Sequence, residues 1–289
     1  MPELPEVEAV VRSLRPLVKE RRIRCVQVLH GIATKPQSAA HLARLAEKQR
    51  IRDVVRKGKY LILKLEGSGI LTMHFRLDGQ LIWFANAKEL EQRANKSSKT
   101  TKSGRDNNSV HVDVALELDK GVLGFADGRH FGRVHAWESA EKCPGLAALG
   151  VDAMSKEFTA AKLRALLASS KRPLKEFLLD QTKVAGIGNI YSCESMWHAR
   201  LDPRQRANSL SVGEAGKLHK AIVSVLARAL ECCLHPAPDF RDPEWWFQGL
   251  EKILRAYDRE GEPCRRCGDP ILCIEQGGRS TYFCGRCQK

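Results

Sequence analysis

The sequence predicts an α+β protein with two main domains and a small metal-binding hairpin near its C-terminus. Two observations lead to this prediction. Apolar residues recur at helical spacing in the first segment, at every second position from about residue 23 to 135, and at helical spacing again beyond about residue 155. Two Cys-x-x-Cys pairs then lie close to the C-terminus. A chain of 289 residues that is 43% hydrophobic is long enough for two domains.

The first segment is predicted to be an amphipathic helix. Its apolar residues are Val7, Val10, Val11, Leu14 and Val18. Intervals of three and four place these side chains on one face of a helix, which can then pack against a core.

The next segment is predicted to be rich in β-strands. The character of the side chains alternates along residues 60–65, and residues 80–84 follow an Asp78-Gly79 turn. Residues 110–118 carry Val or Leu at every second position. Several such strands with few helices predict a β-sandwich or barrel. Residues 93–105, which are rich in Ser, Thr, Asn, Gly and basic residues, are expected to form a mobile loop whose charge is either solvated or functional.

Helical spacing returns in the C-terminal half, around residues 163–178 and 218–230. Between these segments lies the glycine-rich stretch 184–189, predicted to be a turn before a helix. Gly186 and Gly188 would let the amides of that helix approach a phosphate closely, although a purely structural turn fits the pattern equally well.

The cysteine pairs predict a metal site. Cys264 and Cys267, with Cys284 and Cys287, provide four thiolates on two tight turns joined by a hairpin. Four such ligands can surround one Zn²⁺ tetrahedrally and leave no open position, so this zinc is expected to be structural.

The charge of the chain predicts a polyanionic partner. Lys and Arg number 48 against 34 Asp and Glu, a formal net charge of +14. Nucleic acid is the commonest partner for such a chain, and the alternative is a merely basic protein. Ten cysteines without a secretory signal indicate a reducing compartment, and no apolar run approaches the ~20 residues that span a membrane.

The N-terminus offers an unusual nucleophile. Removal of Met1, which the small Pro2 favours, would expose a secondary amine beside the carboxylate of Glu3. An α-amino group has a pKa of ~7.7–8.0 against ~10.4 for lysine, so more of it is neutral at pH 7. Glu3 could serve this chemistry, or it could simply be an acidic residue in the first turn of a helix.

Five tracts of the chain match the signatures of one family in order. They are MPELPEVE at the start, RKGKY at 56–60, DGRHFG at 127–132, LLDQTKVAGIGNIYSCES at 178–195, and the hairpin sequence from residue 261. In these tracts the chain resembles the formamidopyrimidine-DNA glycosylases and endonuclease VIII enzymes of base-excision repair. Leu4 favours the formamidopyrimidine branch, because endonuclease VIII sequences usually carry glycine there.

The resemblance implies an architecture. It consists of an N-terminal β-sandwich domain preceded by a helix (1–136), a helix–two-turn–helix domain (155–260) and a zinc finger (261–289) that holds one structural Zn²⁺. The partner implied is double-stranded DNA that contains damaged bases or abasic sites. We expect a monomer of the bacterial cytoplasm, associated with the nucleoid and not with a membrane.

The activity implied is that of a bifunctional DNA glycosylase and abasic-site lyase. By resemblance, Pro2 attacks the deoxyribose C1′ to give an iminium, and Glu3 donates a proton to the sugar ring oxygen. The expected substrates are oxidised purines, namely 8-oxoguanine and formamidopyrimidines. The alternatives are an oxidised-pyrimidine glycosylase of endonuclease VIII type and a non-catalytic protein that binds damaged DNA.

The resemblance also implies DNA contacts. Lys59 matches a lysine near the lesion and its phosphate, and Arg279 matches an arginine that clamps the phosphates beside the excised nucleotide. Lys175 and Asn189 match positions that contact the DNA backbone or the lesion.

Three further side chains match those that fill the gap left by an extruded base. They are Leu77, Arg129 and Phe131. The surroundings depart from the family pattern, because Leu77 replaces a methionine, Arg76 a glycine, His130 a frequent arginine and Gly128 a proline. The 235–246 segment, with two prolines and two tryptophans, also differs from the usual loop over the base. These departures bear on which lesion the protein prefers. The residues expected to cleave the DNA strand match the family pattern.

Overall fold

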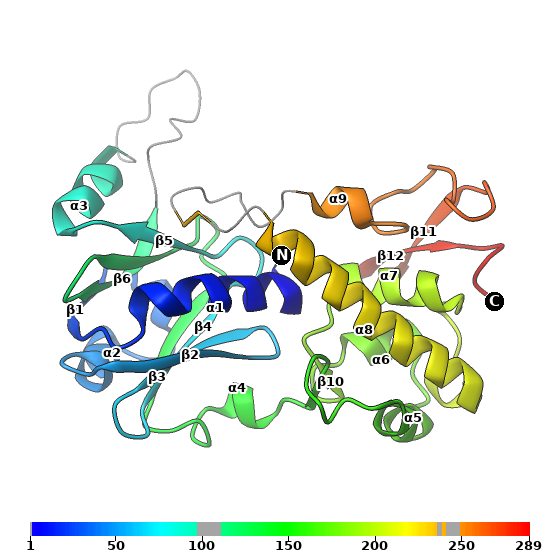
Figure 1. The fold of residues 1–289 in the computed structure, drawn as a ribbon, viewed down its shortest axis with the longest axis horizontal. Helices are drawn as coiled ribbons and strands as arrows, with labels where there is room; N and C mark the ends of the chain where they lie inside the picture. The colour runs from blue at the N-terminus through cyan, green and yellow to red at the C-terminus, as the bar shows by residue number, and fades with distance from the viewer. Residues whose placement is uncertain (1, 97–110, 236–238, 241–248) are drawn as a thin grey trace. The chain divides into compact units, whose positions relative to one another are not determined.

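The computed structural model of the protein describes residues 2–96, 111–235, 239–240 and 249–289. The expected removal of Met1, most of the basic 93–105 segment, and most of the 235–246 segment fall outside these residues. The chain divides into two compact units (Figure 1). The first comprises Met1–Pro2, Val7–Ala147 and Ala237–Trp246, and the second comprises Glu3–Glu6, Ala148–Pro236 and Phe247–Lys289.

The first unit contains two antiparallel four-stranded sheets. One has the strand order β1-β6-β7-β5 and the other β2-β3-β4-β8. The strands are β1 (Ile23–Val28), β2 (Ile51–Lys57), β3 (Tyr60–Leu65), β4 (Ile70–His74), β5 (Gln80–Phe84), β6 (Val112–Leu118), β7 (Val122–Ala126) and β8 (Arg133–Trp137). The expected α+β fold with an N-terminal sheet domain is confirmed. Buried aromatic side chains from both sheets, such as Phe75 and Phe84, form its core.

Helix α1 (Leu4–Val18) precedes these sheets, as the spacing of its apolar residues predicts. Its first turn belongs to the second unit and its remainder to the first. Glu8 on this helix forms an ion pair with Arg56 of β2 at 2.9 Å. Further along, Arg15 donates to the Val54 carbonyl of the same strand at 2.6 Å. These contacts hold α1 along β2.

The first unit has more helices than the sequence predicted. They are η1 (Gly31–Thr34), α2 (Ala39–Ala46), α3 (Ala87–Lys96) and α4 (Pro144–Ala147). Helix α3 corrects the expected loop, because residues 93–96 are its last turn. Reciprocal capping explains this helix: Asn86 accepts from the amide of Glu89 at 3.0 Å, and Glu89 accepts from the amide of Ala85 at 2.7 Å.

The second unit is mainly helical. Its elements are β9 (Val151–Asp152), α5 (Ala160–Ala168), α6 (Leu174–Leu179), β10 (Val184–Ala185), α7 (Asn189–Ala199), η2 (Ala207–Ser209), α8 (Val212–Leu234), α9 (Leu250–Ile253), β11 (Ile271–Gln276) and β12 (Arg279–Cys284). Helix α7 packs against α8 and β12. Pro173 separates α5 from α6, because its ring cannot continue a helix. The hairpin β11–β12 turns at Gly277 and Gly278, both of which have positive φ.

Among the described residues, no helix combines the length and the apolar character needed to cross a membrane.

Candidate functional site

Glu3 is held by the N-terminus of helix α7. Its carboxylate is fully buried and accepts hydrogen bonds from the amides of Gly188 at 2.7 Å and Ile190 at 2.9 Å. A longer bond of 3.4 Å comes from the amide of Tyr191. These amides have no partner within the helix, and the positive end of the helix dipole favours an anion there. The N-terminal segment of the chain is therefore fixed through Glu3, with Pro2 directly before it and also buried.

The glycine-rich turn before α7 makes this arrangement fit. Gly186 has a φ of +104°, and a Cβ at this position would lie 2.2 Å from Leu4 Cδ1. Leu4 also donates its amide to the Gly186 carbonyl at 3.2 Å. The sequence left open whether the turn binds a phosphate or is structural. In this structure Glu3 occupies the amides of Gly188, Ile190 and Tyr191, so these three support the structural reading of the turn, and phosphate binding there stays a prediction.

A second buried carboxylate, that of Glu6, lies beside Glu3. It accepts from the Glu3 amide at 2.8 Å and from the Tyr191 hydroxyl. Burial, followed by the nearby charge of Glu3, raises the pKa of Glu6 from its usual 4.5 to about 7. Glu6 carries no recognisable signal in the sequence, because only the fold brings it to Tyr191.

Glu6→Gln is expected to change how stability depends on pH. The pKa of Glu6 is higher in the folded state than in the unfolded state. The contribution of Glu6 to the free energy of unfolding is therefore fully present below pH 4.5 and is lost as pH rises through about 7. The variant should therefore match the parent at pH 4.5 and exceed it above pH 7, by up to about 3 kcal/mol of unfolding free energy. Urea unfolding at the two pH values measures this difference. Glu91→Gln, at an exposed site on α3, is the control and should show no such difference.

Lys175 and Asn189 connect the beginning of α7 to its surroundings. Lys175 is fully buried, and its Nζ donates to the Asn189 carbonyl at 3.1 Å and contacts Cys193 Sγ at 2.9 Å. The side-chain amide of Asn189 donates to the Ser280 carbonyl of β12 at 3.0 Å. Both residues thus hold α7 to its neighbours, and their contact with DNA stays a prediction.

In the first unit, two turns present the residues expected to fill the gap in a base stack. Leu77 lies half-buried in the turn between β4 and β5. Arg129 and Phe131 lie in the turn between β7 and β8, with Phe131 47% exposed and the Arg129 guanidinium 5.3 Å from the centre of its ring. An ion pair of 3.4 Å between Arg129 and Asp78 connects the two turns. The structure therefore brings Leu77, Arg129 and Phe131 to neighbouring turns.

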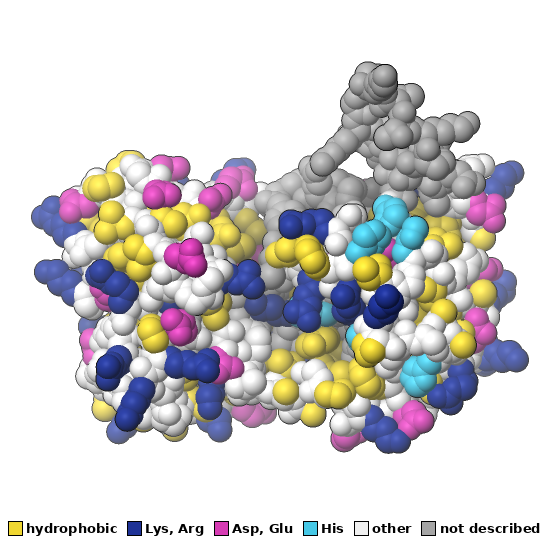
Figure 2. Space-filling model, turned by 180° about the vertical axis from the view of Figure 1, so that it is seen from behind, with side chains coloured by type: hydrophobic (Ala, Val, Ile, Leu, Met, Phe, Trp, Pro, Cys, Tyr) yellow, Lys and Arg dark blue, Asp and Glu magenta, His cyan; other side chains and the backbone are white. Residues whose placement is uncertain are grey.

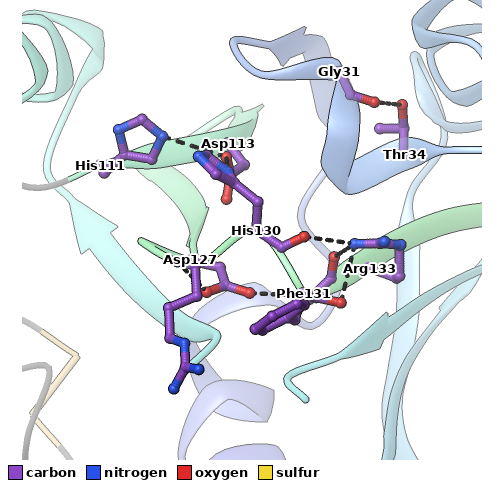
Figure 3. Close-up of polar contacts among 10 residues, drawn as sticks. Gly31, Thr34, His111, Asp113, Asp127, His130, Phe131 and Arg133 are labelled. Atoms are coloured by element: carbon purple, nitrogen blue, oxygen red, sulfur yellow. Dashed lines mark hydrogen bonds and ion pairs between the residues drawn. The ribbon is translucent and has the colours of Figure 1, made fainter. Parts of the chain in front are cut away.

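The turn that carries Arg129 is tightly braced (Figure 3). Asp127 accepts from the amides of Arg129 at 2.9 Å and Gly132 at 2.5 Å. The Arg133 guanidinium donates to the carbonyls of His130, Phe131 and Gly132 at 2.7–3.0 Å. These bonds fix the backbone from which the side chains project.

Lys59 lies half-buried in the turn between β2 and β3. Burial, followed by the charges of Arg76 and Lys59, lowers the pKa of His74 to about 3. Arg76, which stands where the family has a glycine, has a φ of 55° in the left-handed region that glycine adopts without strain. These turns therefore carry two positive charges around a neutral histidine.

The four predicted zinc ligands come together in the second unit. The sulfurs of Cys264, Cys267, Cys284 and Cys287 all lie within 4.8 Å of one another, with 3.5 Å between those of Cys267 and Cys284. Tetrahedral Zn–S bonds of ~2.3 Å require sulfurs ~3.8 Å apart, so the cluster fits one structural zinc. Arg279 is exposed at the start of β12. Among the described residues, its guanidinium makes no hydrogen bond or ion pair.

The zinc cluster packs on helix α7. Trp197 shares a buried apolar cluster with Cys264, Ile271 and Cys284. The Arg266 guanidinium stacks 4.0 Å from the Trp197 ring centre. Glu194 on the same helix accepts from the amides of residues 255, 256 and 257, each at 2.8 Å, and so fixes the segment that leads into the finger. Glu194 was not expected from the sequence, because its role is recognisable only through these partners.

Cys284→Ser is expected to cost the protein its zinc and the hairpin its structure. Metal binding supplies most of the folding free energy of so small a module. The zinc content of the finger, measured by metal analysis, should fall from one ion per chain to none. The amides of β11 and β12 should lose protection from hydrogen exchange, while the amides of the two sheets of the first unit should keep theirs. Cys273→Ser is the matched control, because Cys273 lies on β11 outside the cluster. Retention by Cys284→Ser of a zinc ion bound at the remaining three cysteines would contradict the assignment.

The comparisons with known proteins agree with this geometry. Family models described as the formamidopyrimidine-DNA glycosylase N-terminal domain, the formamidopyrimidine-DNA glycosylase H2TH domain, and the zinc finger found in FPG and IleRS match residues 1–134, 149–234 and 261–289. A formamidopyrimidine-DNA glycosylase of Desulfitobacterium hafniense is 36% identical over the full length of both chains. One from Chloroflexus aurantiacus is 37% identical over 100% of this chain and 98% of that protein.

Solved structures resemble the chain equally well. A complex between Lactococcus lactis Fpg and DNA containing N7-benzyl-Fapy-dG has a TM-score of 0.82 at 28% identity, and covers both chains completely. A complex of the same bacterium's enzyme with DNA containing an abasic site has a TM-score of 0.81 at 27% identity, with the same coverage.

Proposed function

Because the chain belongs to the formamidopyrimidine-DNA glycosylase family, we propose that this DNA glycosylase is bifunctional. It would excise oxidised purines, namely 8-oxoguanine and formamidopyrimidines, from duplex DNA and then cleave the abasic site by β,δ-elimination. Its partner would be double-stranded DNA with a damaged base or an abasic site, bound by a monomer. The zinc would only support the hairpin.

The observation that carries this proposal is the fixed position of Glu3 directly after Pro2. Three backbone amides of the second unit hold the Glu3 carboxylate, so residue 3 has a fixed position. An N-terminus that only began a helix would not need a buried carboxylate at residue 3. With Met1 removed, a secondary amine would stand directly beside this acid, a pairing that suits covalent catalysis.

The proposed reaction uses both groups in sequence. The neutral Pro2 amine forms a bond from its nitrogen to the deoxyribose C1′ while the bond from C1′ to the damaged base breaks, and the proton of the amine passes to the departing base. Glu3 gives a proton to the ring oxygen as the sugar opens, which leaves an iminium on Pro2. The iminium draws electrons from C2′, so a C2′ proton is lost and the 3′ phosphate leaves. A second elimination then releases the 5′ phosphate.

The remaining residues would hold the DNA. Lys59 and Arg279 would bind phosphates near the lesion, and Leu77, Arg129 and Phe131 would fill the gap left by the extruded base. Exposure of Arg279 and Phe131 supports these roles. Burial of Lys175 supports an indirect role, in which it positions Asn189 and the start of α7.

Oxidised pyrimidines are the second candidate substrate. The turn with Leu77 and Arg76 departs from the family pattern, and this turn lies beside the residues that would replace the base. One of the similar structures is described as a Lactococcus lactis Fpg complex with DNA containing an oxidised pyrimidine.

Borohydride trapping with a panel of duplexes tests the proposal. Each duplex carries one lesion: 8-oxoguanine, a formamidopyrimidine, an oxidised pyrimidine or an abasic site. We expect a stable protein–DNA adduct with the purine lesions and the abasic site. Trapping with oxidised pyrimidines alone would favour the second candidate. Tight binding of all duplexes without any adduct would favour a non-catalytic protein and overturn the proposal.

Arg279→Ala is expected to weaken DNA binding while the zinc stays in place. Loss of one phosphate contact should lower the slope of log affinity against log salt by roughly one. Titration of abasic duplex at several salt concentrations measures this slope. Arg286→Ala is the matched control, since Arg286 is also exposed on the zinc finger but is paired with Asp269 at 3.1 Å. Equal slopes for both variants would show that Arg279 does not contact a phosphate.

A further inference from the structure

Three histidines gather around one buried carboxylate in the first unit. His111 lies just before β6, Asp113 lies on β6, and His130 lies in the turn between β7 and β8 (Figure 3). His30 stacks on His111 with 4.1 Å between ring centres. The space-filling view shows histidine side chains gathered close together on one face of the molecule (Figure 2). None of these histidines has a role in the proposed reaction.

Three donor atoms of this group converge. His130 Nδ1 lies 3.0 Å and His111 Nε2 lies 3.6 Å from Asp113 Oδ1, and the three ligand atoms all lie within 4.8 Å of one another. A zinc ion with bonds of ~2.0–2.1 Å needs ligand atoms ~3.3 Å apart. Small side-chain rotations would bring the three atoms to that spacing.

The polar groups of the cluster are incompletely paired. The Asp113 side chain is fully buried, yet its Oδ2 has no hydrogen-bond partner among the described residues. The same holds for His111 Nε2, which is buried although the side chain as a whole is 35% exposed. Buried polar atoms without partners are costly, and a cation would give His111 Nε2 a partner, and Asp113 Oδ2 as well when the carboxylate binds it through both oxygens.

The surroundings of His111 favour its neutral imidazole, the form that binds metal. Burial, followed by the neighbouring His30, lowers the pKa of His111. His130 also neighbours His111, with 4.9 Å between their ring centres. A metal needs the nitrogen that binds it to be unprotonated.

The backbone directs His130 toward Asp113. His130 has a φ of 57°, a left-handed conformation that is uncommon for residues other than glycine. The bonds from Asp127 and Arg133 described above hold this conformation. Strain of this kind persists only where the surrounding structure enforces it, and often lies at binding sites.

We propose that His111, Asp113 and His130 bind one divalent transition-metal ion of the Zn²⁺ class, with water completing its coordination. Two imidazoles and one carboxylate are a donor set that suits such ions. This site is separate from the four-cysteine cluster, because it uses different residues in a different unit. It does not depend on the proposed function.

Metal titration of the full-length protein tests the proposal. The protein is first loaded with zinc at the cysteine cluster and dialysed until one ion per chain remains. Co²⁺ is then added and followed by absorption. We expect one further equivalent, with visible bands of a nitrogen- and oxygen-bound ion and without new thiolate-to-metal absorption. Equilibrium dialysis with Zn²⁺ alone should also give a second equivalent.

Variants assign the site to these residues. In His130→Asn the new residue tolerates the left-handed backbone. The affinity for the second metal ion should fall at least tenfold, because loss of a group that only hydrogen-bonds a metal ligand already costs about that much. Asp113→Asn should do the same. His41→Gln, on α2 outside the cluster, is the matched control and should bind like the parent.

Two results would overturn the proposal. One is a protein that binds only the cysteine-bound ion up to millimolar Co²⁺ and Zn²⁺. The other is a second equivalent that His130→Asn and Asp113→Asn leave unchanged. Thermal unfolding of each variant without added metal shows that it is folded, and added Zn²⁺ should raise the Tm of the parent but not of His130→Asn.

Discussion

Glu3→Gln is expected to reduce base excision by a factor on the order of 10²–10⁴, the usual contribution of a positioned general acid. The variant keeps the size of the side chain and one carbonyl oxygen that can accept from the amides at the start of α7. It loses the proton that Glu3 would give to the sugar ring oxygen. Single-turnover kinetics with an 8-oxoguanine duplex measure the loss.

A substrate with a pre-formed abasic site distinguishes a catalytic role of Glu3 from a structural one. On this substrate the base has already gone, so the lyase rate of Glu3→Gln should fall much less than its excision rate. Because three amides hold the Glu3 carboxylate, the variant also weakens an anchor of the N-terminus. Equal losses on both substrates would mean that Glu3 acts only as this anchor. Thermal unfolding of the variant checks that the fold is retained.

Retention of Met1 is expected to abolish adduct formation. With Met1 present, the Pro2 nitrogen is part of an amide and has no nucleophilic lone pair, so no iminium can form. Borohydride trapping on abasic duplex should then fall below detection, while affinity for the same duplex changes little. Mass spectrometry of the parent adduct should place the DNA on residue 2.

An extension of equal length at the C-terminus is the control for this experiment, and it should trap like the parent. Undiminished trapping with Met1 retained, or an adduct mapped to a lysine, would show that Pro2 is not the nucleophile. The proposed function would then need another amine.

Local signals in the sequence predicted the elements that carry them. The period of two gave strands 60–65 and 80–84 with the bounds that β3 and β5 have. Helical spacing gave α1 and the long helix α8. For α7 only the glycine-rich turn before it predicted a helix, because this helix is buried on nearly every side and has no single apolar stripe. Helix α3 depended on capping by Asn86 and Glu89 rather than on its apolar spacing.

By itself, the sequence determined the chain's class, its zinc ligands and its opening Pro2-Glu3, because each depends on residues close together in the chain or on fixed spacing. The tertiary structure alone decided which groups meet across long separations. It placed Glu3 on the amides of α7, buried Lys175 beneath Asn189, and raised the pKa of Glu6. Hydrogen bonds and burial between distant segments set these outcomes, and spacing along the chain does not encode them.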